Sequence, residues 1–181
     1  MMNLRLATGI VLALTLLAAC SSHRYTVVDA PRKPLTDYEV LEIPTFDSHI
    51  KTREGDELAI KFAGRLMKEI AEYREKHPDQ VIYRDVVNQT SEVNDVLVMN
   101  GTVLSYEEGD RAKRYFLGMG AGKAFCTIQI RFTDKATGEE LAVTNFDGEL
   151  SGGIFGGNSD EAVDGAVKAF LDYMDHYMDR G

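Results

Sequence analysis

The sequence predicts an α+β fold, a two-layer sandwich in which a mostly antiparallel sheet of about five strands carries two helices on one face. Three observations predict it. Apolar residues recur at helical spacing after Gly55 and again after Ser159, and the segment from Ala124 to Thr133 alternates apolar and polar residues as a strand does. A short turn then joins that segment to another strand, so we expect at least one antiparallel hairpin.

Length and charge narrow the classes of function. The chain has 181 residues and a hydrophobic content of 44%, which suits one folded domain rather than a large multidomain enzyme. Its formal net charge is -9, so it lacks the basic surface that nucleic-acid binding requires. We therefore expect no nucleic acid among its partners.

The N-terminus predicts the compartment. Residues 6–19 are nearly all apolar, and as a helix they would extend about 21 Å, which is short for a membrane span and suits a secretory signal. The segment ends Leu17-Ala18-Ala19-Cys20, which resembles the cleavage box of a bacterial lipoprotein signal peptide. The resemblance implies a signal peptide over residues 1–19 and a diacylglyceryl group on Cys20. The alternative is an ordinary secretory signal in which the cysteine is incidental.

By the same resemblance, Ser21 after the lipidated cysteine implies sorting to the outer membrane, with the domain in the periplasm. In a bacterium with one membrane, the domain would face the cell surface instead. Cleavage removes Arg5 and leaves 19 Lys+Arg against 29 Asp+Glu, a net charge of -10. Because the chain is acidic, we expect acyl chains such as palmitate on Cys20, rather than a basic patch, to attach it to its membrane partner.

The remaining chain is expected to divide into two parts. Residues 20–34 are predicted to be the lipidated cysteine and a flexible tether, because they are polar, include Pro31 and Pro34 and show no apolar period. A single globular domain is expected to cover residues 35–181.

The elements of the domain follow in order. A first strand is predicted over residues 38–43 and ends at Pro44. A helix is predicted from Gly55 to Pro78, because apolar residues repeat every three to four positions. Strands are then predicted over residues 81–87, 96–106, 124–133 and 139–146, with a turn over 134–138, and a final helix over 159–178.

Two glycine clusters flank the predicted hairpin. One covers residues 118–122 before its first strand, and the other covers residues 148–157 after its second. Hairpin pairing is expected to bring the two clusters together at one end of the sheet. The first cluster is not a phosphate loop, because Ala124 rather than Ser or Thr follows Lys123 and a strand rather than a helix comes next. We expect no nucleotide partner.

Three blocks of sequence resemble a known family. Residues 114–124 (Arg-Tyr-Phe-Leu-Gly-Met-Gly-Ala-Gly-Lys-Ala), 132–141 and 148–153 are similar to the bacterial domain-of-unknown-function family 4410, whose members look like small envelope lipoproteins. Met119 stands where that family often has an aromatic residue. The resemblance implies no catalytic residue and no cofactor, because the family has no assigned activity. The plan of the fold is also similar to the periplasmic domains of the curli-secretion lipoprotein and of the Tol–Pal β-propeller partner.

The sequence therefore favours a non-catalytic binding or assembly module, with another envelope protein as the expected partner. Glycines let another backbone approach closely, although they equally suit structural loops. The alternatives are a hydrolase of envelope polymers and a ring-forming lipoprotein of the secretion type. The candidate contact surface combines basic, aromatic and glycine residues: Arg114, Tyr115, Gly118, Gly120, Gly122, Lys123, Gly153 and Phe155.

Two further groups of residues were candidates for chemistry. Cys126 lies on the apolar face of its predicted strand and is expected to be a buried, inert thiol. Asp172, Asp175, His176 and Asp179 share one face of the last helix at a spacing that could gather a metal, but a solvated face explains them more simply. We expect neither a metal nor a cofactor.

Overall fold

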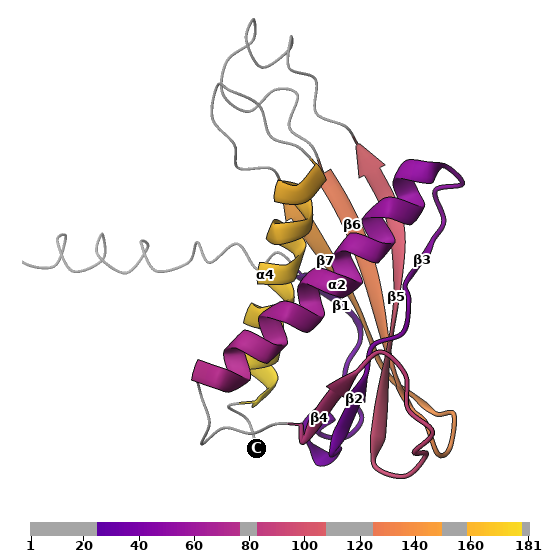
Figure 1. The fold of residues 1–181 in the computed structure, drawn as a ribbon, viewed down its shortest axis with the longest axis vertical. Coiled ribbons are helices and arrows are strands. Elements are labelled where there is room, and N and C mark those ends of the chain that lie inside the picture. Colours follow the sequence, from indigo (N-terminus) through magenta and orange to yellow (C-terminus); the bar gives the residue numbers. More distant parts are fainter. Residues whose placement is uncertain (1–24, 77–82, 108–124, 150–158, 179–181) are drawn as a thin grey trace, which may run out of the picture.

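The computed structural model describes residues 25–76, 83–107, 125–149 and 159–178, so the predicted signal peptide and Cys20 lie outside the described residues. One seven-stranded sheet carries two helices on the same face (Figure 1). The strand order is β1-β7-β6-β5-β2-β4, and β3 also pairs with β5. The elements are β1 (Tyr25–Asp29), the 3-10 helix η1 (Leu35–Asp37), β2 (Val40–Glu42), β3 (Asp47–Ser48), α2 (Arg53–Lys76), β4 (Asp85–Val87), β5 (Val96–Glu107), β6 (Phe125–Asp134), β7 (Glu140–Glu149) and α4 (Ser159–Met178).

The predicted α+β class is confirmed, and the antiparallel centre of the sheet follows the sequence pattern. The apolar face of β6 is buried and its polar face is not, because successive side chains of a strand point to opposite sides. The turn after β6 forms where it was predicted. Gly138 adopts a φ of 72° there, and Asp134 Oδ1 accepts hydrogen bonds from the backbone N–H groups of Ala136 (2.9 Å) and Thr137 (3.0 Å).

The sheet differs from the prediction in being mixed. β2 pairs in parallel with both β4 and β5, and β3 pairs in parallel with β5. The chain returns through α2 between β2 and β4, and a crossover of that kind joins parallel strands. All three residues of β2 are buried, and the strand has a paired neighbour on each side.

A one-residue bulge separates β2 from β3. The chain takes five steps from Glu42 to Asp47 while β5 takes four from Val98 to Thr102. Pro44 lies in this segment and has no N–H to donate to the ladder. The extra residue lets the segment leave the plane of the sheet before it rejoins β5.

The bulge places Phe46 directly on Gly101 of β5. A Cβ added to Gly101 would collide with the Phe46 ring, so only glycine fits beneath it. The ring is buried and lies 5.8 Å from the ring of Phe62, which comes from α2. Phe46 therefore joins the sheet to the first helix.

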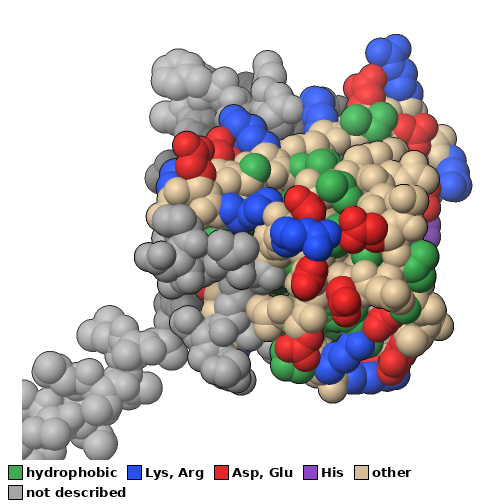
Figure 2. Space-filling view, turned by 60° about the horizontal axis from the view of Figure 1, so that its bottom comes forward, with side chains coloured by type: hydrophobic (Ala, Val, Ile, Leu, Met, Phe, Trp, Pro, Cys, Tyr) green, Lys and Arg blue, Asp and Glu red, His purple; other side chains and the backbone are tan. Residues whose placement is uncertain are grey.

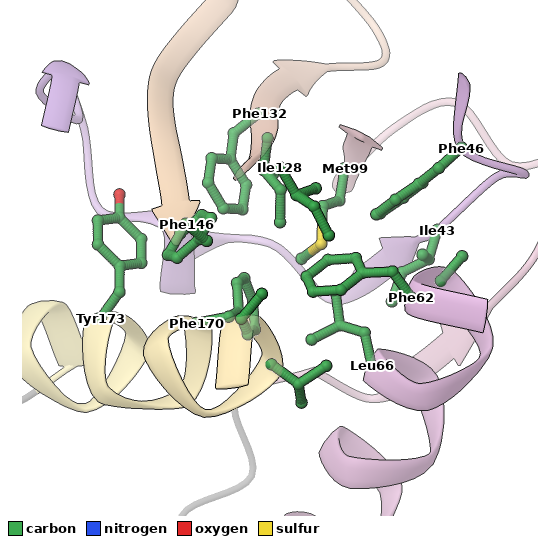
Figure 3. Packing of buried hydrophobic residues seen from close by; sticks show 14 of the residues in the cluster. Ile43, Phe46, Phe62, Leu66, Met99, Ile128, Phe132, Phe146, Phe170 and Tyr173 are labelled. Atoms are coloured by element: carbon green, nitrogen blue, oxygen red, sulfur yellow. The ribbon is translucent and has the colours of Figure 1, made fainter. Parts of the chain in front are cut away.

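The hydrophobic core fills the space between the sheet and both helices (Figure 3). The ring of Phe170 from α4 meets the ring of Phe146 edge to face, with centroids 5.5 Å apart, and Tyr173 stacks on Phe132 at 6.2 Å. Burying one such side chain contributes about 1.5–3 kcal/mol. These contacts hold α4 on β6 and β7, while Phe62 and Leu66 hold α2 beside it.

The prediction of a flexible tether over residues 20–34 is wrong for its second part. Residues 25–29 form β1, which pairs antiparallel with β7 from Tyr25 opposite Phe146 to Asp29 opposite Val143. The ring of Tyr25 also packs edge to face against Tyr173, 5.3 Å away. The folded unit therefore begins before residue 35. The aromatic and β-branched run Tyr25-Thr26-Val27-Val28 is typical of a strand, but nothing local indicates its partner, which lies more than a hundred residues further along the chain.

We expect Gly101→Ala to lower the free energy of unfolding by about 1–3 kcal/mol, because the new methyl group must displace the Phe46 ring. Gly64→Ala is the matched control. Gly64 lies within α2, and a Cβ there meets nothing within 4 Å, so the same methyl group should raise stability by up to about 1 kcal/mol. Urea denaturation measures both variants. A Gly101→Ala variant as stable as the unaltered chain would contradict the packing of Phe46 on β5.

We expect a chain that begins at Ala30, which keeps Lys33, to melt roughly 5–10 °C below a chain that begins at Tyr25, because it lacks the β1–β7 ladder and the Tyr25 ring contacts. Circular dichroism during heating measures both. Equal melting temperatures would show that β1 adds nothing to the folded domain.

Candidate functional site

The candidate contact surface predicted from the sequence lies outside the described residues. Its eight members, Arg114, Tyr115, Gly118, Gly120, Gly122, Lys123, Gly153 and Phe155, all fall within residues 108–124 and 150–158. Their arrangement, and the expected meeting of the two glycine clusters, therefore stay predictions. The structure does describe the strand ends to which both segments are attached.

Three neighbouring strand ends form this attachment frame. Glu107 at the end of β5 pairs with Phe125 at the start of β6, and Phe125 pairs with Glu149 at the end of β7. Residues 108–124 therefore begin and end on adjacent strands, and residues 150–158 begin on the next strand. The attachment points of both segments thus lie side by side at one end of the sheet. Phe125 is 44% exposed in this frame.

The sheet face opposite the helices carries a row of polar pairs between β6 and β7. The members of β6 are the residues that alternate with its buried apolar side chains. Cross-strand pairs of this kind stabilise a sheet by about 0.2–1 kcal/mol each. The polar row consists of Thr127 Oγ1 donating to Asp147 Oδ1 (2.8 Å), Gln129 Nε2 donating to Asn145 Oδ1 (3.0 Å) and Arg131 donating to Glu140 Oε2 (2.7 Å).

The polar row leads into the attachment frame. Phe125 is two residues before Thr127 and therefore lies on the same face. An exposed aromatic ring thus stands at one end of a row of hydroxyl, amide and carboxylate groups. Such a surface can bind a polar partner through hydrogen bonds while the ring supplies apolar contact.

A clamp of three side chains closes the opposite end of the sheet. Lys33 Nζ donates to Asp134 Oδ2 at 2.9 Å, and the buried Tyr38 hydroxyl donates to the same oxygen at 2.8 Å. The ammonium group of Lys33 also lies 4.8 Å from the centre of the Tyr38 ring. The clamp fastens the segment after β1 to the β6–β7 turn. Sequence analysis missed it, because 101 residues separate Lys33 from Asp134.

The clamp changes the acid–base properties of its members. The Lys33 ammonium and then the Tyr38 hydroxyl, both donating to Asp134, hold the pKa of that carboxyl well below its ordinary value. Hydrogen bonds to Tyr38 and Asp134 raise the pKa of Lys33, and burial raises the pKa of Tyr38. At neutral pH, Lys33 therefore stays protonated, Asp134 stays ionised and the Tyr38 hydroxyl stays neutral.

Other ion pairs near this end are also satisfied within the chain. Arg84 contacts three carboxylates, those of Glu39 (2.6 Å), Asp85 (2.8 Å) and Glu92 (3.0 Å). Figure 2, in which the end with the β6–β7 turn comes forward, shows acidic and basic side chains interspersed. These contacts favour a structural role for the charges at this end.

Cys126 is buried, as predicted, and its burial raises the thiol pKa to about 11. A thiol reacts as the thiolate, so this side chain is inert near neutral pH. Asp172, Asp175 and His176 lie on the exposed face of α4. Within residues 25–76, 83–107, 125–149 and 159–178, no group of three His, Cys, Asp or Glu side chains is placed to hold a metal ion, and Asp179 lies outside them.

Neither helix in the described ranges is long and apolar enough to cross a bilayer. The family model of the domain of unknown function DUF4410 matches residues 35–151. The chain belongs to this family. The match includes the three blocks that resemble it, apart from the last residues of the third block. It begins at residue 35 and so leaves out β1, although β1 is part of the sheet.

No curated protein matches the chain. Among solved structures, the PelC dodecamer from Paraburkholderia phytofirmans is 14% identical, with a TM-score of 0.52 over 81% of this chain and 95% of that one. A variant of the same PelC is 12% identical, with a TM-score of 0.51 over 81% and 94%. At these identities the similarity shows a shared fold. Lipoprotein GNA1162 from Neisseria meningitidis is 13% identical, with a TM-score of 0.38 over 76% and 96%.

We expect Asp134→Asn to weaken the dependence of stability on acid pH. The folded-state pKa of Asp134 lies below its ordinary value of 3.8, so the clamp stabilises the fold above about pH 4, and this contribution is lost as the pH falls further. The unaltered chain should therefore lose more free energy of unfolding than the variant between about pH 5 and 2. At neutral pH the variant should be less stable by about 1–2 kcal/mol.

Urea denaturation at several pH values measures this difference. The titration of Lys33 does not affect this comparison. The pKa of Lys33 is raised above its ordinary value of 10.5, so its contribution to stability changes only in alkaline solution. Equal slopes for the two chains would contradict the role given to Asp134.

Proposed function

We propose that the chain is an outer-membrane lipoprotein whose domain acts in the periplasm as a non-catalytic binding or assembly module. The Leu17-Ala18-Ala19-Cys20 box and membership of the DUF4410 family support the anchor and the envelope location. The observation that carries the binding role is the attachment frame, in which Glu107, Phe125 and Glu149 lie on three adjacent strand ends.

A rigid sheet that holds segments at one end is a common design for recognition. Both segments attached to the frame are rich in glycine, and glycine lets the backbone of a partner approach closely. Arg114 and Lys123 would supply positive charge for an acidic partner, while Tyr115 and Phe155 would supply aromatic contact. The polar row extends the same surface along β6 and β7.

Self-assembly into a ring is the second candidate function. It is favoured by the fold that the chain shares with PelC, which is described as a dodecamer. In this case the partner at the attachment frame would be a second copy of the chain.

We expect the double variant Arg114→Glu with Lys123→Glu to lose its envelope partner, because both charges that would attract an acidic partner are reversed. The protein is extracted gently from envelopes, and its native mass and composition are measured. Arg53→Glu with Lys68→Glu is the matched control, because these side chains are 91% and 60% exposed on α2 and the change in net charge is equal.

The Arg114 and Lys123 variant should melt at the same temperature as the unaltered chain. The control should keep the complex, although its new like-charge pairs with Glu57 and Glu72 should lower its melting temperature slightly. A complex retained by the Arg114 and Lys123 variant would contradict binding through this surface. A homo-oligomer of fixed stoichiometry would favour the ring instead.

Replacing residues 1–20 with an ordinary secretory signal should release the protein into the soluble fraction, because neither an acylated cysteine nor an uncleaved apolar segment can then hold it.

A further inference from the structure

The folded domain begins very close to the proposed lipid anchor. β1 starts at Tyr25, which is only five residues after Cys20. A chain of five residues reaches at most about 18 Å when it is fully extended. If Cys20 is acylated, as the proposed function requires, Tyr25 cannot lie further than this from the membrane surface.

The position of Tyr25 on the sheet is asymmetric. It pairs with Phe146, which is three residues from Glu149 at one end of β7 and six residues from Glu140 at the other. At about 3.4 Å per residue, Tyr25 lies about 10 Å from the level of the attachment frame and about 20 Å from the start of β7. The β6–β7 turn extends beyond that start and is more distant still (Figure 1).

These two lengths exclude one orientation of the domain. If the β6–β7 turn pointed at the membrane, Tyr25 would stand more than about 20 Å above the surface, beyond the reach of residues 20–25. If the attachment frame pointed at the membrane, the same chain would span the distance without full extension. The exposed ring of Phe125 lies in the frame and is an apolar group that can enter the boundary between headgroups and acyl chains.

We propose that the short linker over residues 21–24 keeps the attachment frame of Glu107, Phe125 and Glu149 on the membrane-facing side of the domain, with the β6–β7 turn as the part of the domain furthest from the membrane. The proposal rests on lipidation of Cys20. Chain length rather than charge imposes the arrangement, because the mature chain is acidic and an anionic surface repels it.

Two single-cysteine variants of the full lipidated chain test the arrangement. Glu107→Cys places a label in the frame, and Ala136→Cys places one in the turn, about 30 Å away along the strands; both native residues are exposed. The native Cys126 is buried, so a maleimide dye reacts at the introduced site. Each labelled protein is reconstituted in vesicles of phosphatidylcholine, whose neutral surface removes charge repulsion, with an acceptor dye on some headgroups.

We expect energy transfer from Glu107→Cys to exceed that from Ala136→Cys at least about twofold, because the sites differ by about 30 Å in height. Inserting about fifteen Gly and Ser residues after Ser22 should make the two values nearly equal, because a flexible chain of that length no longer orients the domain. Equal or reversed transfer in the unextended chain would overturn the proposal. A difference that survives the insertion would also overturn it, because the linker would not be its cause.

The mass of the purified protein tests the anchor separately. A chain without acyl groups on Cys20 contradicts the proposed function itself. A lipidated chain that shows equal transfer at both sites contradicts only the orientation.

Discussion

The packing of Phe46 on Gly101 is the constraint on which the rest of the structure depends. A glycine in β5 opens a space on the core side of the sheet, and the one-residue bulge between β2 and β3 delivers a ring into it. That ring then meets Phe62, so the first helix is positioned by a contact that begins in the sheet. The bulge also lets one stretch of chain pair with β5 twice, first as β2 and then as β3.

Both helices lie on one face of the sheet, and the two ends of the sheet differ in how their charged groups are paired. At one end the chain satisfies its own charges through the clamp of Lys33, Tyr38 and Asp134 and the pairs around Arg84. At the other end three strands stop together, and the segments attached there carry the basic and glycine residues that the sequence singles out. At one end of the molecule the charged groups are therefore paired within the chain. At the other end, the sequences of the attached segments can change without changing the residues of the core.

Elements with a strong local pattern were predictable from the sequence. The alternation in β6, the turn at Gly138, the apolar stripes of both helices and the burial of Cys126 all depend on residues near one another in the chain. The strand composition of Tyr25-Thr26-Val27-Val28 was overlooked, whereas the partner of β1 and the clamp were beyond local patterns because both join residues more than a hundred positions apart. The parallel pairing of β2 was open to prediction, since strand–helix–strand order favours it. For the candidate site, the sequence predicted how its segments attach, because hairpin connectivity alone determines this.

The pairing of β1 with β7 also orders events in time. Tyr25 precedes its partner Phe146 by 121 residues, so Phe146 is synthesised only after most of the domain. Contacts between residues so far apart form late, because closing a long loop costs entropy before the pairing compensates for it. The N-terminal strand β1 is thus the last strand to dock. Until it docks, the chain that precedes the folded domain is longer, and the end of folding shortens it.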